Sequence, residues 1–419
     1  MSRWKKSNAK SSNNPQRPAV LQQPILAALD LGSNSFRLQI ARVENDQLYM
    51  LDGLREAVRL AAGLTEDKHL DKPAQQRALA CLQRFGERLR GLPHEAVRAV
   101  GTNSLRVAKN APEFLQHAEA ALGFPIEVIA GREEARLIYM GVARGLPQSE
   151  NKRMVMDIGG GSTEFIIGYK WQPLKLESLY MGCVSYSARY FPDGKINKTN
   201  LKQAELAART EVQTIAADFS QGNWDVALGS SGSARVLCDI LEQNGFSSGG
   251  ITRDGLEQLR AYLLRAGDVS KLELQGLKPD RIPVLPGGFA ILYAAFCELD
   301  IGHMQTALGA LREGVLYDLL GRFHHNDMRE ATVQQFMRRY HVDARQAARV
   351  SHLANLLAVQ FLEERLTDEK SRLLGWASNL HEIGISVAHS GYHKHTAYIL
   401  ANADMPGFSK MEQSQLSLL

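Results

Sequence analysis

Hydrophobic and polar positions alternate on both sides of a short polar turn near the start of the chain. The segment ILAALD at 25–30 alternates small and large apolar residues and stops at Asp30, which is typical of a buried strand that enters a polar turn. After the turn, Phe36, Leu38 and Ile40 alternate with polar residues, which predicts a second strand. The pattern therefore predicts two strands joined by a tight turn.

The same pattern recurs in RMVMDIGGGSTEFIIGYK at 153–170. Aligned without a gap, Asp157 falls on Asp30 and Ser162 falls on Ser35. Asp and Gly are common in any tight turn, so a chance likeness would explain a few matches. Because the matches continue into the strands on both sides, the sequence favours one hairpin that has been duplicated.

The two turns are suited to bind a phosphate chain. A strand follows each turn, which excludes the P-loop and the dinucleotide fingerprint, since both need a helix to start there. Glycine lets backbone N–H groups come close to an anion, and serine hydroxyls add further donors. We therefore expect the turns to face each other across a cleft between two domains. The expected contacts are Gly32, Ser33, Asn34 and Ser35 from the first turn and Gly159, Gly160, Gly161 and Ser162 from the second.

Carboxylates accompany both turns. Asp30, Asp157 and Glu164 are hard oxygen ligands, and proteins hold Mg²⁺ with one or two such carboxylates together with phosphate oxygens. An Asp that only helps to form a turn is the alternative at each aspartate. Two aspartates in matching positions favour a magnesium site.

After about residue 323 the strand patterns stop. Residues 331–403 place apolar side chains three and four positions apart, as at Val350, Leu353 and Leu357, which predicts helices. Residues 1–23 contain Lys, Ser, Asn, Gln and Pro without an apolar run, which predicts a disordered tail, with contact to a membrane or a polyanion as the alternative.

Composition changes this picture little. The chain of 419 residues is 44% hydrophobic and 22% charged, as in ordinary soluble proteins. Its formal charge of +4 does not favour a nucleic-acid partner. The four cysteines are scattered without a CxxC pair, so we expect reduced thiols and a cytoplasmic protein. No apolar run reaches the roughly 18 residues of a membrane helix.

Several segments together resemble the exopolyphosphatase and guanosine pentaphosphate phosphohydrolase family. They are DLGSNS, DIGGGSTE, GTNSLRVAKN (101–110), GREEARLIYMG (131–141), MGCVS (181–185), GSSGSARVL (229–237) and ALREGVLYD (310–318). The resemblance runs from about Pro24 to Phe408. It implies an α/β fold of two duplicated ribonuclease H-like domains, of the actin, heat-shock ATPase and sugar kinase superfamily, followed by an all-helical HD-like domain. The implied domains are 24–137, 138–322 and 323–419.

The resemblance also assigns roles to residues whose patterns are ambiguous by themselves. Glu133 and Glu134 stand in the first turn of a predicted helix, where the helix dipole favours acids. The resemblance implies that Glu134 is the general base for the attacking water, and that Glu133 is the weaker candidate, facing solvent or an Arg. It places Arg106 near the bound phosphates, which an Arg fork suits, against the alternative of an exposed helical Arg. Arg37 is left outside this catalytic set.

A Gly and Ser turn at Ser231 and Gly232 leads from a predicted strand into a helix. In the kinases of the superfamily this region cradles adenosine, and a phosphate-binding helix start is the other option. The sequence leaves both open.

The stretch NLHEIGISVAHSGYHKHTAYIL at 379–400 holds several histidines. It is similar to the family's helical domain, but Glu382 stands where an HD site needs Asp. We therefore expect structural or substrate-contacting histidines rather than a metal centre. His393, Lys394 and His395 are candidates to line a basic path for a long polyanion.

The resemblance implies Mg²⁺-dependent hydrolysis of the terminal phosphoanhydride of inorganic polyphosphate, with a monovalent cation as an additional candidate cofactor. The alternatives are a guanosine pentaphosphate phosphohydrolase, a regulator that binds guanosine penta- or tetraphosphate without turnover, and an ATP-dependent kinase or chaperone ATPase. The helical domain favours the long substrate. A homodimer is expected, and because longer members carry a further C-terminal domain, a truncated chain is expected too.

Overall fold

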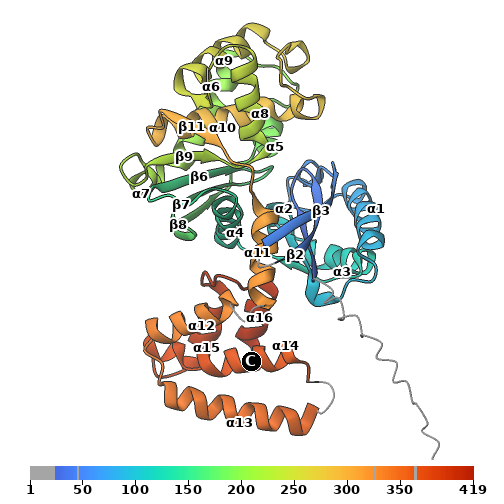
Figure 1. The fold of residues 1–419 in the computed structure, drawn as a ribbon, viewed down its shortest axis with the longest axis vertical. Coiled ribbons are helices and arrows are strands. Elements are labelled where there is room, and N and C mark those ends of the chain that lie inside the picture. The colour runs from blue at the N-terminus through green and yellow to red at the C-terminus, as the bar shows by residue number, and fades with distance from the viewer. Residues whose placement is uncertain (1–23, 45–46, 324–326, 363–365) are drawn as a thin grey trace, which may run out of the picture.

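The computed structural model describes residues 24–44, 47–323, 327–362 and 366–419. Two α/β domains and one helical domain follow each other along the chain (Figure 1). The predicted tail at 1–23 lies outside the described residues. Among the described helices, none has the length and apolar character needed to cross a membrane.

The first domain is built on a five-stranded sheet with the order β3-β2-β1-β4-β5. β1 pairs antiparallel with β2 and parallel with β4. The strands are β1 (Ile25–Leu31), β2 (Phe36–Glu44), β3 (Gln47–Glu56), β4 (Val97–Gly101) and β5 (Ile126–Val128). The helices are α1 (Lys72–Leu89), α2 (Asn103–Val107) and α3 (Ala111–Leu122), with the 3-10 turns η1 (Leu60–Gly63) and η2 (His94–Ala96).

The second sheet repeats the first. Its order is β10-β11-β9-β6-β7-β8, in which β8-β7-β6-β9-β11 matches β3-β2-β1-β4-β5. Leu31 pairs with Phe36 across the first hairpin and Ile158 pairs with Thr163 across the second, so both turns close at the same register. This confirms the duplicated hairpin and the ribonuclease H-like order.

The strands of the second domain are β6 (Lys152–Ile158), β7 (Thr163–Tyr169), β8 (Gln172–Leu179), β9 (Val226–Gly229), β10 (Ile251–Thr252) and β11 (His303–Thr306). Its helices are α5 (Cys183–Tyr190), α6 (Lys198–Gln213), α7 (Ala216–Phe219), α8 (Gly232–Gln243), α9 (Arg253–Ala266) and α10 (Leu285–Glu298), with the 3-10 turns η3 (Val269–Lys271) and η4 (Pro279–Val284).

Two helices join the sheets. α4 (Gly131–Arg144) packs against α11 (Leu311–Phe323), which also contacts β1 and leads into the helical domain (Figure 1). One apolar core contains Leu26 of β1, Val155 of β6, Leu137 of α4 and Leu316 of α11, so both sheets share it. The predicted domain boundary at 137/138 falls within α4, and the one at 322/323 falls at the end of α11.

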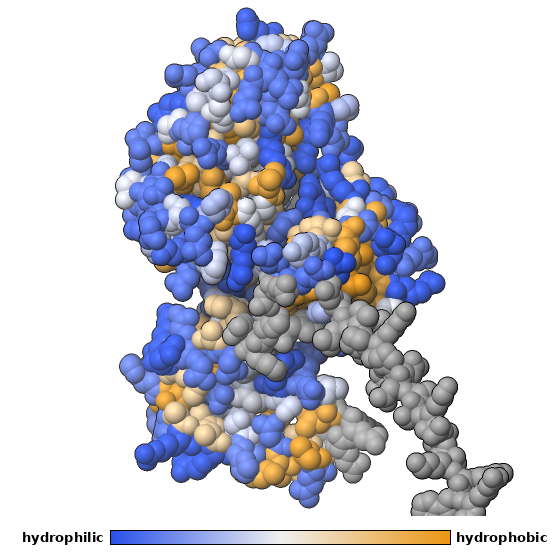
Figure 2. All heavy atoms as spheres, in the orientation of Figure 1, coloured by the Kyte–Doolittle hydropathy of each residue, from blue (hydrophilic) through white to orange (hydrophobic). Residues whose placement is uncertain are grey.

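The third domain contains only helices and turns in its described residues, as predicted. They are α12 (Met328–Arg339), α13 (Ala344–Leu362), α14 (Asp368–Leu380), η6 (Ile383–Ser386), α15 (Tyr392–Asn402) and α16 (Lys410–Leu418). Its core includes Val333, Phe336, Trp376, Leu380 and Phe408. α13 also exposes several apolar side chains, and part of this face is visible at the lower end of the molecule (Figure 2).

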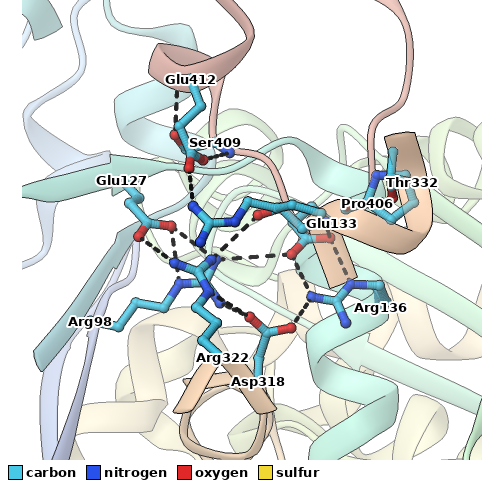
Figure 3. Close-up of polar contacts among 12 residues, drawn as sticks. Arg98, Glu127, Glu133, Arg136, Asp318, Arg322, Thr332, Pro406, Ser409 and Glu412 are labelled. Atoms are coloured by element: carbon cyan, nitrogen blue, oxygen red, sulfur yellow. Dashed lines mark hydrogen bonds and ion pairs between the residues drawn. The ribbon is translucent and has the colours of Figure 1, made fainter. Parts of the chain in front are cut away.

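A buried group of ion pairs near the start of α4 connects the first sheet, α4 and α11 and extends to the helical domain (Figure 3). Arg98 of β4 contacts Glu127 of β5 at 2.9 Å and Asp318 of α11 at 2.7 Å. Arg136 of α4 contacts the same Asp318 at 2.5 Å. Burial raises the pKa of the Asp318 carboxyl, but the positive charges of Arg136, Arg98 and Arg322 outweigh burial and hold this pKa below its ordinary value.

We expect Asp318→Asn to lower the free energy of unfolding by about 3–5 kcal/mol at pH 7, because it removes the negative charge that the buried Arg98 and Arg136 share and leaves their positive charges only partly compensated. Because the folded protein binds the Asp318 proton more weakly than the unfolded chain does, the carboxylate stabilises the fold above about pH 4 and loses this effect as the pH falls further. When the pH is lowered from 7 to below 4, the free energy of unfolding measured with urea should therefore fall less in the variant than in the wild type. Asp218→Asn, which breaks the exposed pair with Lys175, should change stability by about 1 kcal/mol or less. An equal effect of both substitutions would contradict a special role for the buried group.

Candidate active site

A cavity lies where the two duplicated hairpins meet. Most residues that the sequence assigned to the site line it: Asp30, Gly32, Ser33, Asn34, Ser35, Glu134, Asp157, Gly159, Gly160, Ser162, Ser231 and Gly232. Three of the assigned residues do not line it: Arg106, Gly161 and Glu164. Residues from both domains and from α4 therefore share one crevice.

The two turns touch each other. A Cβ atom added to Gly160 would lie 2.9 Å from the Cβ atom of Ser33 and 3.3 Å from the backbone nitrogen of Asn34. Gly161 packs in the same way against Asn103 at the start of α2, behind the cavity lining. A larger residue at either glycine would force the turns apart, which explains why glycines occupy these positions.

The backbone of both turns is oriented alike. The carbonyl oxygens of Ser33 and Asn34 accept hydrogen bonds of 2.9 and 2.8 Å from N–H groups at and next to η1. The carbonyl oxygens of Gly159 and Gly160 accept bonds of 2.9 to 3.1 Å from the first N–H groups of α5. Within the described residues, the N–H groups of Ser33, Asn34, Gly160 and Gly161 have no hydrogen-bond partner. They can donate to an anion in the manner of a backbone nest.

Glu134 enters the cavity from the first turn of α4. Its side chain accepts a 2.7 Å ion-pair hydrogen bond from Nη1 of Arg106, which also donates to the carbonyl oxygen of Ile129 at 3.0 Å. Burial lowers the pKa of the Arg106 guanidinium, but the charges of Glu134 and Glu164 raise it above its ordinary value overall. Arg106 therefore stays charged and holds the Glu134 carboxylate, and it is not among the residues that line the cavity.

The three candidate metal ligands occupy different environments. Burial raises the pKa of Asp30 to about 7, despite the positive charges of Arg312 and Arg37. Burial also raises the pKa of Asp157 to about 6, although its carboxylate accepts a 2.5 Å hydrogen bond from Ser230. Asp30 and Asp157 line the same cavity as Glu134. The negative charges of the neighbouring carboxylates help to raise the pKa of both aspartates.

Glu164 pairs with Asp157 across β6 and β7 but lies behind the cavity lining. Its carboxylate accepts a 2.8 Å hydrogen bond from Ser178. Burial, together with the charges of Glu134 and Asp157, raises the pKa of Glu164 well above its ordinary value. Among the described residues, no three His, Cys, Asp or Glu side chains gather as a self-sufficient metal site. Asp30 and Asp157 still fit a hard cation whose other ligands are phosphate oxygens, because such a cation would relieve the repulsion between these half-buried carboxylates.

Four arginines that the sequence did not assign to the site also line the cavity: Arg37, Arg235, Arg281 and Arg312. Burial, together with the positive charge of Arg312, lowers the pKa of Arg37 to about 10. Arg37 lies opposite Asp30 in the pairing of β1 with β2. The register of the predicted hairpin could therefore have assigned Arg37 to the site. Arg312 lies in the segment ALREG, whereas Arg281 comes from η4 and carries no sequence signal.

The start of α8 also faces the cavity. The Ser231 side chain accepts a 3.0 Å hydrogen bond from the N–H of Ala234 and so caps the helix. Gly232 lies against Arg281, since a Cβ atom added there would come within 2.6 Å of Nη2. This wall of the cavity therefore combines a helix N-terminus with a guanidinium group, and both favour an anion.

The chain matches known proteins over nearly all of its described length. A model of the Ppx/GppA phosphatase family matches residues 39–323, and a model of domain III of this family matches residues 328–419. An exopolyphosphatase from Cytophaga hutchinsonii is 24% identical over 71% of this chain and 98% of that one, with a TM-score of 0.62. A Ppx/GppA family member from Aquifex aeolicus is 24% identical over 72% of this chain and 99% of that one, with a TM-score of 0.59.

The two solved structures support the fold, and the family models connect the α/β domains and the helical domain to one family. Because the first model alone covers more than half of the sequence, this chain belongs to the Ppx/GppA phosphatase family.

Proposed function

We propose that this phosphatase is an exopolyphosphatase, which hydrolyses the terminal phosphoanhydride of inorganic polyphosphate and releases orthophosphate. The observation that supports this proposal most is the lining of the cavity. Four arginines and two turns with free N–H groups surround it, and within the described residues no aromatic side chain lines it. Such a lining suits a chain of phosphoryl groups better than a nucleobase, for which aromatic stacking is a common contact.

In the proposed reaction, Glu134 accepts a proton from a water molecule while the water oxygen attacks the terminal phosphorus. The bond from this phosphorus to the bridging oxygen breaks, and the electron pair leaves with the shortened chain. Arg106 holds the Glu134 carboxylate in place, and the four arginines offset the charge on the phosphoryl oxygens. Asp30 and Asp157 are the candidate ligands for Mg²⁺, which when bound would supply Lewis-acid neutralisation of phosphate oxygens.

A second candidate substrate is guanosine pentaphosphate. A shallow depression adjoins the cavity lining at Arg281 and Ser233, and its walls are mainly apolar. They include Val236, Leu237, Val284 and Leu285. This apolar neighbour of a phosphate site is the observation that favours a nucleoside.

The test is phosphate release from long polyphosphate, tripolyphosphate and guanosine pentaphosphate, each with Mg²⁺ and with a chelator. We expect the highest kcat/KM with long polyphosphate and no release in chelator. Faster turnover of guanosine pentaphosphate would assign the second activity instead. Binding of guanosine pentaphosphate without release from any substrate would indicate a regulator. Glu134→Gln protein from the same purification controls for contaminating phosphatases. The expected homodimer and cytoplasmic location stay predictions.

A further inference from the structure

The first turn of α4 connects the proposed base to all three domains. Arg132 contacts Glu177 of β8 at 2.7 Å and Asp404 of the helical domain at 2.6 Å. The next residue, Glu133, points into the helical domain, and the one after it, Glu134, enters the cavity. Three consecutive residues therefore contact the second domain, the helical domain and the cavity.

Glu133 is almost fully buried, at 4% exposure, and its carboxylate has partners on both sides. Nε and Nη2 of Arg136 donate to it at 2.8 and 2.7 Å. The backbone N–H of Gly407 in the helical domain donates to it at 3.0 Å. Figure 3 shows the Glu133 carboxylate facing Arg136 in the middle of the buried ion pairs. We predicted an arginine partner or solvent for this residue, and the arginine partner is confirmed.

The turn that receives Glu133, residues 404–407, is held from its other side by α12. Thr332 donates a 2.7 Å hydrogen bond to the carbonyl oxygen of Pro406. Gly407 has a φ of +90°, and a Cβ atom added there would lie 2.9 Å from the backbone nitrogen of Arg329. The 404–407 turn is thus fixed between α12 and the start of α4.

We propose that the 404–407 turn, acting through Glu133, positions Glu134 for attack. Glu133 and Glu134 are adjacent in one helical turn, and the N–H of Glu134 bonds to the carbonyl oxygen of Ala130 at 2.9 Å. A shift of the Glu133 backbone therefore shifts the Glu134 carboxylate relative to the phosphate turns. Glu133 and Thr332 are positioning residues, and the helical domain contributes to the chemical step for substrates of any length. This inference rests on the proposed function of Glu134.

Substrate length separates this role from that of a simple binding surface for long chains. We expect Glu133→Ala to lower kcat on tripolyphosphate by about tenfold to a hundredfold with KM changed less than about twofold, because small displacements of a reacting group are costly. Glu133→Gln, which keeps an oxygen for the Gly407 N–H, should recover most of that loss. Thr332→Val, which releases the far side of the 404–407 turn and changes no residue of α4, should also lower kcat.

Glu205→Ala is the matched control. Glu205 is buried and accepts two hydrogen bonds from Arg260, at 2.7 and 3.0 Å, within the second domain. The Glu205→Ala substitution should lower the unfolding temperature but leave kcat unchanged. Equal losses of kcat in Glu205→Ala and Glu133→Ala, or a rise in KM for long polyphosphate alone, would overturn the positioning role.

Hydrogen exchange of the peptide that covers residues 130–138 gives a readout without turnover. We expect faster amide exchange there in Thr332→Val than in wild type, and wild-type exchange would overturn the inference. If the wild-type protein releases no phosphate from any substrate, the proposed function fails, whereas the exchange measurement still decides whether the 404–407 turn holds α4.

Discussion

We expect Glu134→Gln to lower phosphate release by about 10²- to 10⁴-fold, the contribution typical of a positioned general base. The amide retains the size of the side chain and an oxygen for Arg106, but it cannot accept a proton from water. The cavity keeps its four arginines and its free N–H groups, so substrate affinity should change little. Single-turnover phosphate release and a separate binding titration with tripolyphosphate measure the two effects.

Glu87→Gln is the control for this substitution, because it removes the same charge from an exposed position in α1 of the first domain. It should keep wild-type turnover. Near wild-type turnover in Glu134→Gln would remove Glu134 from the role of base. A parallel loss of binding would show that the carboxylate organises the cavity instead of activating water.

The second large effect is expected for Asp157→Asn. The Asp157 side chain is half-buried beside other negative charges, and its raised pKa of about 6 means that its ionisation costs free energy. A bound Mg²⁺ would offset this cost, so wild-type protein should gain thermal stability as Mg²⁺ is added at pH 8. The variant should lose this gain, and it should turn over at least about a hundredfold more slowly, since charge neutralisation by a metal is worth several kcal/mol.

Without Mg²⁺, Asp157→Asn should stabilise the fold. An acid whose pKa is raised in the folded state destabilises the fold as the pH rises from its unfolded value near 4 through about 6. Asp157→Asn removes that effect and should raise the unfolding temperature in chelator at pH 8. Asp225→Asn, near the other end of β6, is the matched control and should leave the Mg²⁺ response intact. An unchanged Mg²⁺ titration in Asp157→Asn would exclude it as a ligand.

Much of the cavity could be predicted because its residues belong to short local patterns. A turn between two strands needs small and polar residues in a few adjacent positions, and this signal is visible at Gly32 and Gly160 without any knowledge of distant contacts. Repetition of the pattern then implied two related units. The matching strand orders of the two sheets explain why Asp30 and Asp157 reach the same crevice.

The cavity residues that the sequence did not predict depend on contacts between distant segments. Arg281 reaches the cavity from η4, and Arg312 reaches it from the start of α11. Arg106 is expected near the phosphates, and the packing of α2 pairs its guanidinium with the Glu134 carboxylate, a contact that no local pattern predicts. No local pattern encodes such distances, because they follow from how whole helices pack on the sheets.

The sequence by itself determined the duplicated hairpins, the change to helices after residue 323, and the small and polar residues of both turns. These features depend on periodicity and on backbone freedom, which act between neighbouring residues. Only the tertiary structure decided which arginines enter the cavity, and that Glu133 bonds to the helical domain while Glu134 enters the cavity. The physical reason is that adjacent residues of a helix point in different directions, and only the packed neighbours decide what each one meets.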